Sequence, residues 1–259
     1  MKEYLHFIQR GNQKGPLVIL LHGFTGSCEE FIELITPFEK DFNFALIDLP
    51  GHGKSLNLED YTPAFVFKQL EIISNGRKIC CLAGYSMGGR VALHYALKHP
   101  GLVDKLVLES SSAGIDDEAE RAARRKSDQH WIDYLNSHSI EEFLQAWYEQ
   151  AIFSDLKKNT QSLEMLIGQK KNNAPVELAK ALQHMGQSVM PGLWQELHHL
   201  TSKTWLLCGA LDEKYLAIHE KMLNRVPHAR RIVFNHAKHN IHFAQPVEFA
   251  SRLKEILYE

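Results

Sequence analysis

A serine lies between glycines at residues 84–88, where the chain reads Gly-Tyr-Ser-Met-Gly and continues with Gly89. An apolar, strand-like run at 79–83 comes directly before this segment, and a helical stretch at 87–98 follows it. A strand, a tight turn and a helix in this order present a serine hydroxyl as a reactive group, and the glycines permit the turn. The pattern predicts that Ser86 takes part in chemistry. The alternative is a glycine-rich turn with an incidental serine.

A serine hydroxyl needs a base to activate it, and the base needs a carboxylate to orient it. In sites built on such a turn, the chain order is serine, acid and histidine. Asp212 follows the apolar run 205–208 and so falls at the carboxyl end of a predicted strand, with Glu213 as the neighbouring alternative. Asp48 also follows a predicted strand, but it precedes the serine, and a turn-stabilising role suits it better. Asp212 is therefore the candidate acid.

The histidine is harder to choose, because the chain has 15 of them. Three of these, His236, His239 and His242, follow the last predicted strand, where the base of such a site belongs. Their positions alone do not decide which of the three histidines is the base.

Backbone N–H groups near the serine could stabilise a negatively charged oxygen. Residues 22–24, His-Gly-Phe, follow the predicted strand 17–21. The N–H of Phe24 is therefore placed to join that of Met87 in an oxyanion hole. We interpret the His22 imidazole as a structural hydrogen-bonding group.

Arg90 could contribute a positive charge to the same place. It lies one helical turn after Ser86, so the two side chains share a helix face. A cation close to a helix N-terminus makes a site for a carboxylate. The alternative for a helical arginine is a solvated surface charge.

Short apolar runs alternate with amphipathic stretches along most of the chain, which predicts a parallel sheet with crossover helices. The apolar runs are typical of strands buried on both faces. The predicted strands are 17–21, 44–47, 79–83, 106–109, 205–208 and 231–234, and the predicted helices are 63–74, 87–98 and 247–257.

The alternation breaks between residues 113 and 200, where the sequence is helical, charged and aromatic. Successive helices are predicted at 116–135, 140–149, 156–171 and 176–185, with prolines and a glycine between them. A helical block between two halves of one sheet predicts a lid, 113–200, over a single core. We expect that core to consist of 1–112 and 201–259.

Composition excludes several classes of partner. The chain has 259 residues and a formal net charge of −2, which gives no bulk attraction to nucleic acid or to an anionic membrane. No targeting segment or membrane span is visible. The four cysteines lack metal-ligand spacing, which favours reduced thiols in a cytoplasmic protein without a metal site. We expect a monomer or a small homo-oligomer.

The residues named so far resemble the α/β-hydrolase superfamily over nearly the whole chain. Five segments are similar to 2-succinyl-6-hydroxy-2,4-cyclohexadiene-1-carboxylate (SHCHC) synthases, and several of them lie outside the motifs that hydrolases share. These segments are 84–93 (GYSMGGRVAL), 118–131 (EAERAARRKSDQHW), 146–153 (AWYEQAIF), 185–194 (MGQSVMPGLW) and 207–215 (LCGALDEKY). The resemblance implies an α/β-hydrolase fold, with a mostly parallel central sheet, flanking helices and an inserted helical lid.

The resemblance also implies a reaction. SHCHC synthases eliminate pyruvate from the tricarboxylate 2-succinyl-5-enolpyruvyl-6-hydroxy-3-cyclohexene-1-carboxylate, in menaquinone biosynthesis, and need no metal or organic cofactor. The family's triad carries over to Ser86, Asp212 and His239. Residues 235–239 (NHAKH) fit the family's loop before its histidine, except that Lys238 stands where glycine is common.

Substrate contacts are implied in the same way. The family's contacting residues carry over to Tyr85, Arg90, Arg124 and Trp147, and a further family arginine falls at Lys170, which cannot form arginine's bidentate fork. Such cations suit a substrate with three carboxylates. From spacing alone, Arg124 could instead belong to a solvated helix face, and Trp147 could be lid core.

These assignments imply that Ser86, activated by His239, acts as a base rather than as a nucleophile. The N–H groups of Phe24 and Met87 would meet the charge that develops on the substrate. One alternative is a serine esterase or carbon–carbon bond hydrolase, which an apolar acyl pocket would favour. Another is a non-catalytic interaction module, which an intact triad argues against.

Overall fold

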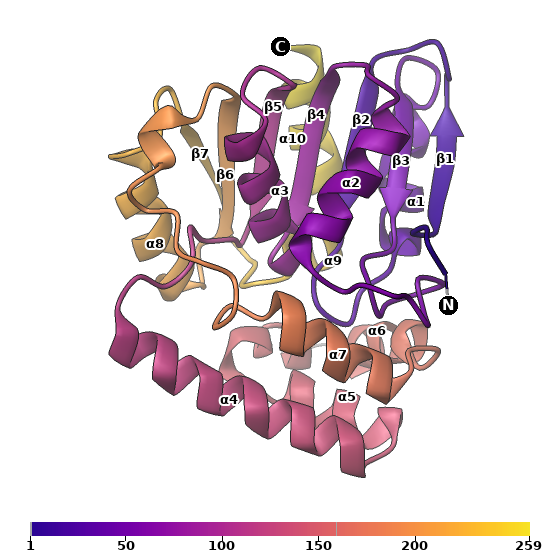
Figure 1. Cartoon of the computed structure of the whole chain (residues 1–259), viewed down its shortest axis with the longest axis vertical. Helices are drawn as coiled ribbons and strands as arrows, with labels where there is room; N and C mark the ends of the chain where they lie inside the picture. Colours follow the sequence, from indigo (N-terminus) through magenta and orange to yellow (C-terminus); the bar gives the residue numbers. More distant parts are fainter. Residues whose placement is uncertain (1, 159) are drawn as a thin grey trace.

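Seven strands form one sheet that runs through the middle of the protein (Figure 1). A computed structural model describes residues 2–158 and 160–259. The strand order is β1-β3-β2-β4-β5-β6-β7, and every pairing is parallel except that of β1 with β3. The strands are β1 (Phe7–Gly11), β2 (Leu17–Leu21), β3 (Asn43–Ile47), β4 (Ile79–Tyr85), β5 (Val103–Glu109), β6 (Lys203–Gly209) and β7 (Arg230–Phe234).

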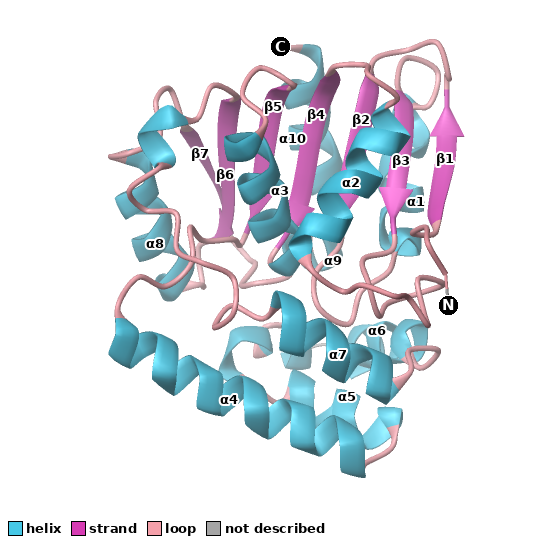
Figure 2. Ribbon diagram, viewed as in Figure 1, coloured by secondary structure: helices cyan, strands magenta, loops and turns pink. Residues whose placement is uncertain are grey.

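Helices cover both faces of this sheet, as Figure 2 shows. One apolar core joins the sheet to α2 (Pro63–Ser74), α3 (Met87–Lys98) and α8 (Glu213–Leu223). A second core, on the other face, joins it to α1 (Ile32–Ile35) and α10 (Pro246–Tyr258). Strands β2 and β3 are buried at every residue, as expected for parallel strands covered on both sides. The predicted fold class is therefore confirmed.

The prediction lacks strand β1, helix α8 and the short helices α1 and α9 (Ile241–Ala244) of the core. Strand β1 has the sequence FIQRG and is mostly exposed at the edge of the sheet, so it offers no apolar run. Helix α8 begins directly after Asp212, which lies in the short connection that follows β6, and the Asp212 side chain accepts a hydrogen bond from the Tyr215 N–H at its first turn. All the predicted strands and core helices are present, and their ends lie within three residues of the predicted ones.

The stretch between β5 and β6 is helical, as predicted. It contains α4 (Glu118–Ser137), α5 (Ile140–Tyr148), α6 (Thr160–Lys170) and α7 (Pro175–Met185), and no strand occurs among its described residues. Figure 1 shows these helices together beyond the carboxyl ends of the parallel strands. They share an apolar cluster of their own, centred on Phe143, Leu144 and Trp147.

None of the helices among residues 2–158 and 160–259 is long and apolar enough to span a membrane.

The fold brings the ends of the sheet strands and the helices α4–α7 to one place. The carboxyl ends of β2, β4, β5 and β6 point towards the helices α4–α7, and the predicted site residues lie where these two parts meet.

Candidate active site

Ser86 occupies the sharp turn between β4 and α3. Its backbone angles are φ 49° and ψ −104°, an unusual conformation for a residue other than glycine. The neighbouring glycines leave no room for a side chain. A Cβ on Gly84 would lie 2.5 Å from the Gly88 carbonyl carbon, and one on Gly88 would lie 2.4 Å from the Leu21 oxygen. The sequence therefore imposes a turn that pushes the Ser86 hydroxyl away from the sheet.

His239 and Asp212 complete a relay with this hydroxyl. His239 Nε2 lies 3.0 Å from Ser86 Oγ, and His239 Nδ1 lies 3.3 Å from Asp212 Oδ2. Both partners are about 95% buried. This arrangement suits an imidazole that donates Nδ1–H to the carboxylate and accepts the serine proton at Nε2. Asp212 is capping α8 as well, so its carboxylate is fixed from two sides.

The other candidates lie elsewhere. His236 is exposed, and Glu213 begins α8 with its side chain in solvent. His242 is buried, but its Nδ1 lies 2.8 Å from Glu109 Oε2 rather than near Ser86. Of the three histidines after the last strand, only His239 contacts the serine.

Glu109, the last residue of β5, holds both the serine and the histidine loop. Its backbone oxygen accepts a hydrogen bond from Ser86 N at 2.9 Å. Its carboxylate oxygen Oε1 accepts from the N–H groups of Ile241 and His242 at 2.8 and 3.0 Å. The loop that carries His239 is thus fastened to the strand beside Ser86.

Phe24 and Met87 are the two residues whose backbone N–H groups the sequence assigned to an oxyanion hole. Both line the cavity into which Ser86 opens. Met87 is the first residue of α3, so its N–H has no partner within the helix. The next residue after Phe24, Thr25, has φ 70°, which shapes the turn that carries the Phe24 N–H. Both residues therefore adjoin Ser86, and their role as an oxyanion hole stays a prediction.

The cavity has a volume of about 760 Å³ including its open mouth. Tyr85 and Trp147 supply aromatic walls, and the Trp147 ring centroid lies 5.0 Å from that of Phe24. Among the described side chains, three that carry a positive charge line it, and we call them the cavity cations: Arg90, Arg124 and Lys214.

Arg90 is only 5% exposed. Its Nη2 donates to the Met185 oxygen at 3.3 Å, whereas its Nε finds no partner among the described residues. Burial lowers the pKa of Arg90 to about 10, so the side chain stays charged at neutral pH. Arg124, from α4, differs because Asp128 Oδ1 lies 2.6 Å from its Nε, and its Nη1 donates to Gln187.

Lys170 lies outside the cavity. It is 4% exposed, forms a buried ion pair with Glu30 and donates to the Thr25 oxygen at 3.5 Å. Burial alone would lower the pKa of Lys170, but the Glu30 carboxylate outweighs burial and raises it. The structure thus brings together every predicted site residue except Lys170.

Glu30 continues from Lys170 into a row of buried charges. Its Oε2 lies 3.7 Å from His242 Nε2, and His242 contacts Glu109 on its other side. Burial alone would lower the pKa of His242, but Glu109 and Glu30 raise it to about 9. We call this alternating row, Lys170–Glu30–His242–Glu109, the charge chain.

Sequence reasoning missed Lys214, Glu109 and Glu30. Lys214 had a usable signal, because it follows Asp212 by two residues at the same edge of the sheet. Glu109 also ends a predicted strand beside the one that carries Ser86. Glu30 had no usable signal in the sequence, since its partners Lys170 and His242 are far away along the chain.

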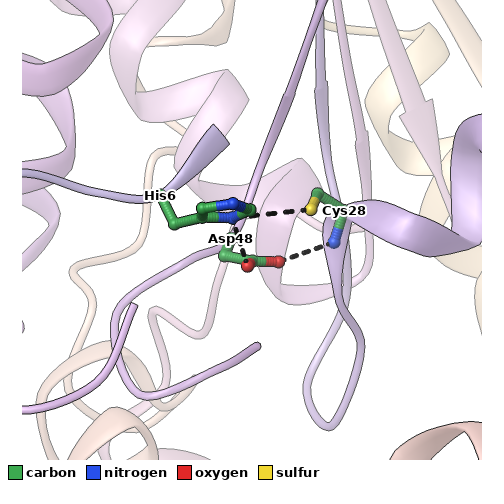
Figure 3. Close-up of side chains that lie close together, drawn as sticks. All are labelled: His6, Cys28 and Asp48. Carbon is green, nitrogen blue, oxygen red and sulfur yellow. Dashed lines mark hydrogen bonds and ion pairs between the residues drawn. The ribbon is translucent and has the colours of Figure 1, made fainter. Parts of the chain in front are cut away.

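One further cluster joins a histidine, a cysteine and a carboxylate (Figure 3). Asp48 accepts the Cys28 N–H at 2.7 Å and the Lys54 N–H at 2.8 Å, and His6 Nδ1 lies 2.9 Å from its Oδ2. These residue types could bind a metal. In the absence of one, burial raises the pKa of the Cys28 thiol, which therefore keeps its proton. The contacts of Asp48 are those of a residue that braces a turn.

Comparisons with known proteins agree with this geometry. A family model described as the alpha/beta hydrolase fold matches residues 16–246. The chain is 32% identical over 252 residues to the SHCHC synthase of Yersinia pestis bv. Antiqua (strain Nepal516), which covers 96% of this chain and 89% of that protein.

Solved structures give the same result. MenH from S. aureus superposes with a TM-score of 0.91 at 30% identity, covering 98% of both chains. An esterase from Exiguobacterium antarcticum reaches a TM-score of 0.81 at 16% identity, over 98% of this chain and 96% of that one, and shares the fold alone. The chain belongs to the α/β-hydrolase fold family and, within it, to the 2-succinyl-6-hydroxy-2,4-cyclohexadiene-1-carboxylate synthases.

Proposed function

We propose that this protein eliminates pyruvate from 2-succinyl-5-enolpyruvyl-6-hydroxy-3-cyclohexene-1-carboxylate, with the Ser86–His239–Asp212 relay as the base. One observation carries the proposal beyond family membership. The serine opens into a cavity that also holds the buried Arg90 guanidinium, which has no carboxylate partner among the described residues. A neutral ester gives such a cation nothing to bind, whereas a tricarboxylate does.

The chemistry follows from the positions of the protons. His239 takes the Ser86 proton at Nε2, and Asp212 stabilises the imidazolium that forms. The serine oxygen then removes a ring proton from the substrate. The electrons of that C–H bond form a new ring double bond, the existing ring double bond shifts by one position, and the C–O bond to the enolpyruvyl group breaks. The released enolpyruvate takes up a proton to become pyruvate. The step needs no acyl-enzyme.

Charge that develops on the substrate during proton removal needs fixed donors close by. Phe24 and Met87 line the cavity beside Ser86, and their N–H groups would serve in this role. Tyr85, Arg90, Arg124 and Trp147 line the same cavity and would hold the substrate. Lys170 has its ammonium group on Glu30, and we assign it a supporting role behind the oxyanion turn.

We further propose that residues 113–200 act as a lid over a core made of 1–112 and 201–259. Arg124 and Trp147 lie on α4 and α5 within that stretch, so a lid would carry part of the substrate site. Exclusion of water by such a lid would strengthen the contacts between the cavity cations and carboxylates. We place the protein in the cytoplasm, as a monomer or small homo-oligomer, working without a metal or organic cofactor.

The decisive experiment follows pyruvate release from the enolpyruvyl substrate. Ser86→Ala and His239→Ala should each lower the rate by about 10⁴-fold or more, and Asp212→Asn somewhat less. His236→Ala is the matched control, because that side chain is exposed on the same loop. Mass spectrometry during turnover should find no covalent adduct on Ser86. Rapid hydrolysis of p-nitrophenyl esters with an acyl-enzyme burst, and no pyruvate, would assign the protein to the esterases instead.

A further inference from the structure

A third positive charge lines the cavity besides the two arginines. Lys214 is the second residue of α8 and follows the triad residue Asp212 by two positions. Its side chain lines the same cavity as Ser86 and Arg90, and its ammonium nitrogen lies 5.9 Å from the centre of the Tyr215 ring. The residue is also solvent-exposed, so it lies where the cavity meets the surface.

The carboxylates around these cations are too few to neutralise them. Among residues 2–158 and 160–259, no carboxylate oxygen lies within ion-pair distance of Arg90 or Lys214, whereas Arg124 is paired with Asp128. Asp212 faces His239 instead. Partial burial and the nearby charge of Arg124 lower the pKa of Lys214, as is typical of an ammonium group that lacks a counter-ion.

The two lysines near the site differ in this respect. Lys170 is buried against Glu30, so it could bind a substrate carboxylate only after that ion pair had broken. Breaking a buried pair leaves one charge without a partner, which is costly. Lys214 has no such pair to break, and its ammonium is a mobile point charge on a flexible stem.

We propose that Lys214 is the third carboxylate-binding cation of this site, beside Arg90 and Arg124. The proposal rests on the proposed function, because it takes the substrate to be a tricarboxylate. Three cavity cations then match three carboxylates, with Lys170 left to its structural ion pair. At the rim of the cavity, Lys214 also attracts the anion before it binds.

A group that holds the substrate equally in the ground state and in the transition state affects KM rather than kcat. Lys214→Met should therefore lower kcat/KM for pyruvate release by about tenfold, mostly through KM, in line with one partly exposed charge-assisted hydrogen bond. Lys214→Arg should recover most of the loss, because it keeps the charge. Lys221→Met is the matched control, since Lys221 is exposed on the same helix.

Calorimetry with tricarballylate, a small tricarboxylate, tests the anion site independently of turnover. The wild type should bind it, Lys214→Met should bind it about tenfold more weakly, and Lys221→Met should match the wild type. Binding that Lys214→Met leaves intact and Lys170→Met abolishes would overturn the proposal, as would a wild type that binds no tricarballylate. Tricarballylate binding that depends on Lys214, without pyruvate release, would refute the proposed function and leave the anion site standing.

Discussion

Two groups of charged side chains lie beside the same serine and differ in whether their charges are balanced. In the charge chain, each positive group faces a carboxylate, as Lys170 faces Glu30 and His242 lies between Glu30 and Glu109. Among the cavity cations, Arg90 and Lys214 face no carboxylate in the described part of the chain. The charge chain is buried, whereas among the cavity cations Arg90 is buried, Arg124 is half-buried and Lys214 is exposed at the rim.

This difference in charge balance distinguishes side chains that stabilise the fold from side chains that bind the substrate. A buried charge with an internal partner contributes to holding segments together, and breaking the pair destabilises the fold. A buried charge without one costs stability in the free protein and recovers that cost when a ligand supplies the opposite charge. The charge chain should therefore govern stability, and the two cavity cations without a carboxylate partner, Arg90 and Lys214, should govern affinity.

Removing one end of the charge chain should have the largest effect on stability. Lys170→Met leaves the Glu30 carboxylate buried with less positive charge around it, so the free energy of unfolding should fall by about 3 kcal/mol or more. Urea unfolding followed by fluorescence gives this value. The double variant Glu30→Gln/Lys170→Met removes both charges and should regain a substantial part of the loss. If the single variant is as stable as the wild type, the ion pair does not hold the fold.

The pH dependence of stability tests the middle of the charge chain. The pKa of His242 is raised to about 9, above its unfolded value of roughly 6.5. Its stabilisation is therefore complete below about pH 6.5 and is lost as the pH rises through 9. Between these limits the free energy of unfolding should fall by about 3 kcal/mol more in the wild type than in His242→Gln.

Denaturant unfolding at a series of pH values measures this difference. His236→Gln, which changes an exposed histidine on the same loop, should keep the wild-type profile. A His242→Gln profile parallel to that of the wild type would mean that His242 is not held in its protonated form.

Arg90 should behave in the opposite way, with a smaller effect that appears in catalysis. Arg90→Met should lower kcat/KM by about tenfold to a hundredfold, since a shielded charge-assisted hydrogen bond is worth roughly 1.5–3 kcal/mol. Its free energy of unfolding should stay unchanged or rise, because the buried guanidinium has an Nε without a partner. Arg90→Lys should recover only part of the activity, because the fork geometry is lost. A strongly destabilised Arg90→Met with normal kinetics would remove the distinction between the two groups.

The parts of this molecule that the sequence predicts well are those that local patterns determine. The strand–turn–helix around Ser86 follows from glycines that no other residue could replace, and β2 and β3 follow from continuous apolar runs. Strand β1 was not predicted because an exposed edge strand needs no continuous apolar run. Lys170 was matched to an arginine by its position in the chain, whereas its role depends on Glu30, which is 140 residues away in sequence.

Glu109 has a mechanical consequence for the reacting atoms. Its backbone oxygen holds Ser86, and its carboxylate holds the loop of His239 through Ile241 and His242. Because Ser86 and the His239 loop are both hydrogen-bonded to Glu109, the distance between them depends only on the few bonds that connect them through this residue. If each were held by a different element, the movements of both elements would add to that distance. Slow bending of the sheet should carry the serine and the histidine along together. The distance of 3.0 Å between Ser86 Oγ and His239 Nε2 can then stay nearly constant while the rest of the molecule fluctuates.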